Sequence, residues 1–103
     1  MTNNQASIDL LKEAIATREP LIEYTDQEQL DVFKKEREIL DKIKEAPTPD
    51  ETLNAYVNAL SVALTAVIEI KEAMLAGASL NAAELSAVVT ANDLEEEIAE
   101  KYL

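Results

Sequence analysis

Carboxylates are the side chains of this sequence that could do chemistry, because the chain contains no histidine and no cysteine. Without histidine the commonest general base is missing, and Ser-His-Asp and Cys-His arrangements for nucleophilic catalysis cannot form. Zinc sites lose both of their preferred ligand types, and Glu-x-x-His di-iron sites are excluded. The single glycine excludes glycine-rich phosphate loops. We therefore predict no catalytic residue, no enzyme activity and no cofactor.

Two groups of carboxylates are spaced closely enough to act together. Glu69 and Glu72 are three residues apart, which places them on one face of a helix, but the aspartate spacing of a calcium loop is absent. The densest acidic run consists of Asp93, Glu95, Glu96, Glu97 and Glu100. This run is either a solvated outer face or a patch for a basic partner that imitates a row of phosphates. The sequence leaves both interpretations open, and we predict no metal site.

The elements that must position these side chains are organised around one apolar stretch. From Thr52 to Ile68 there is no charged residue, and the polar residues follow one line along a helix. A helix that is apolar on nearly every face is either buried or spans a membrane. The uncharged polar residues within the stretch favour burial. We therefore predict a long central helix over about 49–76 that does not lie in a membrane.

The polar line of this helix offers a candidate contact for a partner. It carries four uncharged residues, Asn54, Asn58, Ser61 and Thr65. One interpretation is a stripe that faces solvent. The other is a small uncharged groove on which a partner helix packs, with the amides setting its register.

Capping patterns predict the helices that precede the central one. Residues 1–6 are expected to be frayed, and Ser7 to cap a helix that ends near Thr17. Thr25 begins a capping box in front of a helix over 26–45. Five of the nine basic residues belong to this second helix, where they alternate with acids. That alternation predicts a salt-bridged face in solvent.

Similar signals mark the two ends of the central helix and the C-terminal part of the chain. Thr48 begins a second capping box, and Gly77 is placed for a left-handed C-terminal cap. Asn81 is then expected to cap a helix. Asn92 has the features of a further cap, so 81–102 is either one helix or two, and we favour a break at Asn92.

These elements predict an all-α fold, a single helical domain over 1–103. It is a small bundle of four to five helices around the central one, and 26–45 and 49–76 form an antiparallel hairpin because their connection is short. A central helix of some 27 residues is about 40 Å long, whereas a compact domain of this size is roughly 34 Å across. The central helix should therefore bend, or protrude where a second copy or a partner covers it.

Charge and the absence of catalytic motifs decide the predicted function. A net charge of -12 disfavours nucleic acids and anionic membranes as direct ligands. The N-terminal residues lack the pattern of a secretory signal, so we expect a cytoplasmic protein. We predict a non-catalytic protein–protein interaction or structural assembly module, an acidic helical bundle that forms a homo-oligomer. The alternative is an acidic inhibitor or nucleic-acid mimic, of the kind that phages and plasmids encode, in the basic groove of another protein.

Overall fold

Helices account for nearly all of the described chain, which in the computed structural model comprises residues 4–17, 25–46 and 48–103. They are, in chain order, α1 (Asn4–Thr17), α2 (Asp26–Glu45), α3 (Glu51–Leu75) and α4 (Asn81–Tyr102). None of the described residues belongs to a strand. The predicted all-α helical bundle is therefore confirmed.

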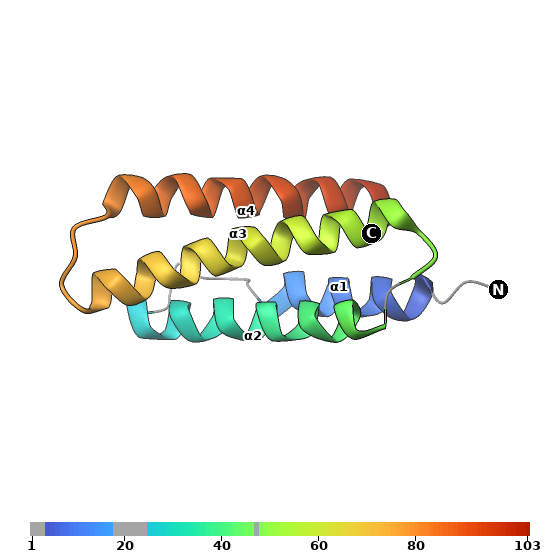
Figure 1. Cartoon of the computed structure of the whole chain (residues 1–103), viewed down its shortest axis with the longest axis horizontal. Helices are drawn as coiled ribbons and strands as arrows, with labels where there is room; N and C mark the ends of the chain where they lie inside the picture. The colour runs from blue at the N-terminus through green and yellow to red at the C-terminus, as the bar shows by residue number, and fades with distance from the viewer. Residues whose placement is uncertain (1–3, 18–24, 47) are drawn as a thin grey trace.

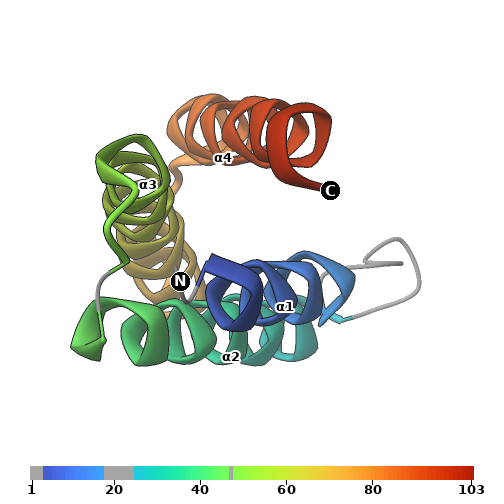
Figure 2. The same cartoon turned by 90° about the vertical axis from the view of Figure 1, so that its right-hand side faces the viewer.

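The four helices lie side by side along one axis, and helices that are consecutive in the sequence are neighbours (Figure 1). α1 packs on α2, α2 on α3, and α3 on α4. Seen along the axis, they form an open arc with α1 and α4 at its two ends (Figure 2). Because α3 is the main neighbour of α4, a large part of the α4 surface is covered by no other helix.

The overall shape corrects the expectation that α3 is too long for its domain. A domain as broad as it is long was assumed from the sequence, but the molecule measures 49 × 24 × 22 Å. The 25 residues of α3 span about 37 Å, so they fit along the long axis. α3 therefore has no need to protrude from the end of its own domain.

The core lies where the helices face one another. Leu11 of α1, Phe33 of α2, Leu64 of α3 and Ile98 of α4 are each at most 1% exposed. Burying a side chain of this size stabilises the fold by about 1.5–3 kcal/mol before conformational entropy is subtracted. Glu36 of α2 is also fully buried, so the charged face predicted for this helix does not lie wholly in solvent.

Two predicted caps are confirmed. Thr25 Oγ1 accepts the backbone N–H of Glu28 at 3.2 Å, and Glu28 Oε1 accepts the backbone N–H of Thr25 at 3.0 Å. Gly77 lies just beyond α3 with a φ of 109°, a left-handed backbone that a residue with a Cβ rarely adopts. These two signals could be recognised in the sequence because each depends on residues close together in the chain.

The starts of α1 and α4 differ from the predictions. Of the residues predicted to be frayed, 1–6, residues 4–6 form the first turn of α1, while residues 1–3 lie outside the described residues. Ser7 is therefore a buried residue inside α1 and not its cap. At α4 the N-cap position belongs to Leu80, without a side-chain hydrogen bond, and Asn81 is the first helical residue.

α3 begins at Glu51, and its cap is Asp50 rather than Thr48. Asp50 Oδ1 accepts the backbone N–H of Leu53 at 3.1 Å. Thr48 lies just before this cap, where its Oγ1 accepts the backbone N–H of Asp50 at 3.2 Å. The Thr48 hydroxyl therefore stabilises the turn before the helix and not the first turn of the helix itself.

α4 is one continuous helix, so the predicted break at Asn92 is wrong. Asn92 is exposed, whereas Ala91 and Ile98 are fully buried. The apolar spacing that one helix can satisfy decides the structure, because burial against α3 outweighs the weak local preference of asparagine for a cap.

α3 is the one helix in the described part of the chain whose length and composition would allow it to cross a membrane. In its most apolar window 44% of the residues are buried inside the bundle. One face of α3 is therefore buried in the core, and the other face leaves apolar side chains exposed.

The capping box of α2 gives a first prediction. Replacing Thr25 with alanine should lower the free energy of unfolding at pH 7 by about 1 kcal/mol.

The pKa of Glu28 is held below its ordinary value of 4.5 because the carboxylate accepts hydrogen bonds from Thr25. This stabilisation is present above pH 4.5 and is lost as the pH falls through the lowered pKa. In urea titrations, the difference in stability between the wild-type chain and Glu28→Ala should therefore narrow in acid, and a constant difference would contradict the prediction.

Candidate functional site

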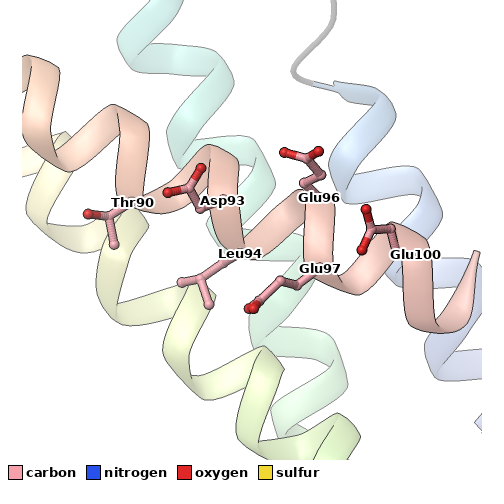
Figure 3. A pocket seen from close by; sticks show the side chains of 6 residues that line it. All are labelled: Thr90, Asp93, Leu94, Glu96, Glu97 and Glu100. Atoms are coloured by element: carbon pink, nitrogen blue, oxygen red, sulfur yellow. The ribbon is translucent and has the colours of Figure 1, made fainter.

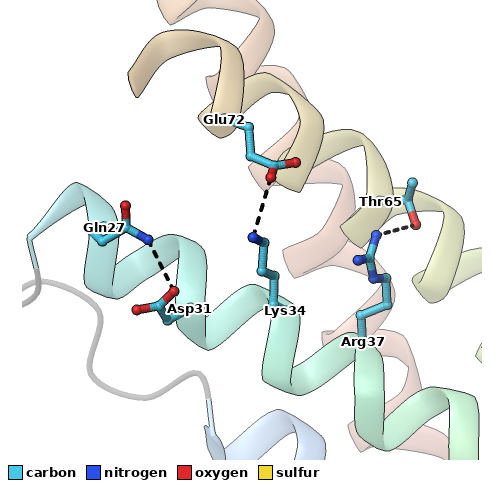
Figure 4. A network of polar contacts seen from close by, with 6 residues as sticks. All are labelled: Gln27, Asp31, Lys34, Arg37, Thr65 and Glu72. Atoms are coloured by element: carbon cyan, nitrogen blue, oxygen red, sulfur yellow. Dashed lines mark hydrogen bonds and ion pairs between the residues drawn. The ribbon is translucent and has the colours of Figure 1, made fainter. Parts of the chain in front are cut away.

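α2 and α3 are joined by a seam of polar contacts (Figure 4). Lys34 Nζ lies 3.3 Å from Glu72 Oε2, and Arg37 Nη1 donates to Thr65 Oγ1 at 3.4 Å. Further along, Lys44 Nζ donates to Ser61 Oγ at 3.5 Å. Two members of the uncharged line on α3, Ser61 and Thr65, therefore contact basic residues of α2 within the same chain.

Most of the predicted partner-contact residues thus have partners inside the fold. Ser61 is only 5% exposed, and Thr65 is half-buried. Asn54 binds the turn before α3, where its Nδ2 donates to the Thr48 carbonyl at 2.7 Å. Asn58 is exposed, so it is the member of the set whose surface is open to another molecule.

Beyond Asn58 the surface of α3 becomes apolar and forms one wall of an open groove, with α4 as the other wall. The groove has a volume of about 560 Å³. Its lining consists of four alanines, one valine and one leucine, with Asn58 and Thr90 as the polar residues; the apolar ones are Ala59, Val62, Ala63, Ala66, Ala87 and Leu94. Small side chains on both walls allow a helix or an extended segment to approach closely.

Exposed large hydrophobic side chains are gathered in the same half of the molecule. Those in the described part of the chain are Val62, Leu75, Leu80, Leu85, Val89 and Leu103. All belong to α3, α4 or the residues next to α4, whereas the described residues of α1 and α2 contribute none. The exposed large hydrophobic side chains of the described residues therefore all come from the α3–α4 part of the chain.

The predicted acidic patch lies on α4, next to this groove (Figure 3). Four of its five members line a second depression, together with Thr90 and Leu94; they are Asp93, Glu96, Glu97 and Glu100. Thr90 and Leu94 also line the apolar groove, so the two depressions form one continuous surface. Glu95 does not belong to it, because its side chain is turned into the bundle and is 8% exposed.

A buried lysine fixes the N-terminal half of α4. Lys71 of α3 is 4% exposed, and its Nζ donates to Gln29 Oε1 at 2.9 Å. The same Nζ lies 3.5 Å from Glu84 Oε2 and 5.7 Å from the centre of the Phe33 ring. One ammonium group therefore connects α2, α3 and α4.

A tyrosine fixes the other end of α4. Tyr102 Oη donates to Asp50 Oδ2 at 3.3 Å, and its ring meets the ring of Tyr56 edge-on with centroids 6.3 Å apart. Loss of solvent around the phenol and the negative charge of Asp50 raise the pKa of Tyr102. Together with the Lys71 contacts, this cluster holds α4 along α3 and so sets the width of the groove.

Comparisons with protein-family models, with curated proteins and with solved structures found no match. The described residues also contain no group of three or more metal-ligating side chains that could hold an ion. Function is therefore inferred from the surface of this chain alone, and the apolar groove with its acidic border is the feature that distinguishes that surface.

Val62 and the groove alanines were not recognised as functional residues from the sequence. The stretch from 52 to 68 is apolar on nearly every face, so its pattern does not reveal which face remains exposed. A weak signal existed, because Ala55, Ala59, Val62 and Ala66 recur at helical spacing and are smaller than the leucines of the core face.

Proposed function

We propose that the chain is a non-catalytic protein-interaction module whose contact surface is the outer face of α3 and α4. The observation that carries the proposal is the apolar lining of the groove, to which the exposed Val62 belongs, together with further exposed large hydrophobic side chains on α3 and α4. Val62 is 72% exposed and Leu85 is 66% exposed. An apolar groove with exposed apolar side chains on its walls is typical of a site where another protein binds.

The lining of the groove supports a protein partner over a small molecule. Sites for substrates or cofactors place several polar groups around an apolar cavity and enclose most of the ligand. Here Asn58 and Thr90 are the polar side chains of the lining. Apolar side chains of a partner could pack on such a surface without further polar groups. We therefore propose a module that binds another protein and is not an enzyme.

In this proposal α3 is the central helix of the bundle. α2 packs on one side of α3 and α4 on another, and the outer face of α3 binds the partner. The partner is either a second copy, which makes the chain a cytoplasmic homo-oligomer, or a different protein. Neither nucleic acid nor a membrane is a direct ligand, because both would be repelled by a net charge of -12.

A specific observation favours a second candidate, the acidic inhibitor. Asp93, Glu96, Glu97 and Glu100 line one depression, and none of them takes part in the ion pairs between described residues. Carboxylates in a row can occupy sites that a basic protein offers to phosphates. This candidate uses the same face of α4 and differs from the first in the partner that it requires.

Affinity purification from the native cells tests the proposal. The tagged wild-type chain is compared with Val62→Gln/Leu85→Gln/Val89→Gln, which alters the α3–α4 face, and with the control Lys35→Gln/Glu38→Gln/Asp41→Asn on exposed α2. We expect the wild-type and control chains to retain the same partner and the face variant to lose it. If all three chains retain the same proteins, the proposed contact surface is wrong.

A further inference from the structure

We propose that the groove between α3 and α4 binds a basic amphipathic helix of another protein. This inference rests on the proposed function and adds the chemistry of the partner. The apolar groove and the acidic depression share Thr90 and Leu94. A single segment that fills the groove would therefore lie beside the carboxylates of α4.

The shape of the groove favours a helix as the occupant. Its walls are two long helices, and Ala59, Ala63 and Ala66 on α3 and Ala87 on α4 leave room between them. A third helix that packs there would place apolar residues three and four positions apart against these alanines. Val62 would contact the same apolar stripe, because it lines the groove and is 72% exposed.

The charges beside the groove determine which charge the polar face of the bound helix should carry. Asp93, Glu96, Glu97 and Glu100 lie next to it (Figure 3). The one basic residue of α4, Lys101, lies over the Tyr56 ring, with Nζ 5.9 Å from the ring centre. Lysines and arginines on the flank of the bound helix would meet uncompensated negative charge, which accelerates association and selects against acidic partners.

A second copy of the chain fits this surface less well. Each copy has a net charge of -12. The basic residues of α2, the most basic helix, alternate with exposed acids such as Glu38 and Asp41. No described helix of this chain therefore presents a continuous basic flank, so charge complementarity points to a different protein.

Titration with designed peptides tests the inference. The probe is a peptide of about 18 residues, or five helical turns, with leucines three and four positions apart and lysines elsewhere. One control peptide has glutamate at every lysine position, and another has the same composition in scrambled order. Binding to the isotope-labelled full chain is monitored by amide NMR shifts and by calorimetry at about 50 mM and about 300 mM salt.

We expect the basic helix to bind most tightly and to shift the amides of Ala59, Val62, Ala66 and Ala87. Its affinity should fall about tenfold at the higher salt and about tenfold in Glu96→Gln/Glu97→Gln/Glu100→Gln. The control Glu38→Gln/Asp41→Asn/Glu45→Gln removes the same charge from α2 and should leave the affinity within about twofold, since none of these three residues lines the groove or the acidic depression. Val62→Gln should weaken binding without changing the salt dependence.

Three results would overturn the inference. The first is equal affinity for the basic and acidic peptides, and the second is equal loss in the α2 and α4 charge variants. The third is a chain that dimerises through Val62 and is not dissociated by the basic peptide, which would identify a second copy as the occupant. In the third case the proposed function as an interaction module still stands. That proposed function is refuted by a different result, in which Val62→Gln/Leu85→Gln/Val89→Gln retains the same proteins as the α2 control in the affinity purification.

Discussion

Replacing Lys71 with alanine is expected to lower the free energy of unfolding by about 3 kcal/mol. The substitution removes a hydrogen bond to Gln29, an ion pair with Glu84 and the packing of the lysine stem near Phe33. Lys71 is 4% exposed, so water cannot replace these contacts without entering the bundle. Urea unfolding measures the loss, and hydrogen exchange locates it in the N-terminal half of α4.

Two further variants separate the charge from the packing. Lys71→Met keeps most of the buried stem and should recover roughly half of the lost stability. Lys34→Ala removes a more exposed ion pair, with Glu72, in which the two side chains are 44% and 50% exposed. The Lys34→Ala substitution should lower the free energy of unfolding by less than about 1 kcal/mol. If Lys71→Ala and Lys34→Ala were equally stable, α4 would not depend on the Lys71 contacts.

Two leucines provide the second large contrast. Leu64→Ala should lower the free energy of unfolding by about 3 kcal/mol, because Leu64 is fully buried and its removal leaves a cavity. Leu85→Ala should change it by no more than about 0.5 kcal/mol, because Leu85 is 66% exposed. The two substitutions are chemically identical, so the difference reports burial alone.

This contrast bears on function as well as on stability. An exposed leucine that does not stabilise the fold has no role within the isolated chain. We expect Leu85→Ala to weaken retention of the partner while the urea midpoint stays unchanged. A large loss of stability in Leu85→Ala would show that the outer face of α4 is covered inside the bundle and would contradict the proposed contact surface.

The sequence predicted the helices well because their signals are local. Thr25 with Glu28 and the glycine after α3 act within four residues, and the apolar spacing of α2 and α3 is strong. The break at Asn92 was predicted wrongly because a cap preference was weighed without the tertiary contacts of Ala91 and Ile98. Contacts between two different helices cannot be deduced from such short patterns.

The candidate site was only partly predictable for the same reason. The acidic run was visible, but the burial of Glu95 depends on how α4 rotates against α3. The polar line of α3 was recognised, yet its pairing with Arg37 and Lys44 required the α2–α3 contact. The groove itself requires two helices that are adjacent in space, so neither of its walls identifies it alone.

Site-specific photo-crosslinking tests the central claim most directly. A benzophenone amino acid replaces either Val62, on the outer face of α3, or Asp41, on the exposed face of α2, and the native cells are irradiated. We expect position 62 to yield one discrete crosslinked protein, and position 41 to yield none. The mass of the product distinguishes a second 11.3 kDa copy from a different protein. Crosslinking that is absent at position 62, or equal at the two positions, would contradict the claim that the α3–α4 face binds a partner.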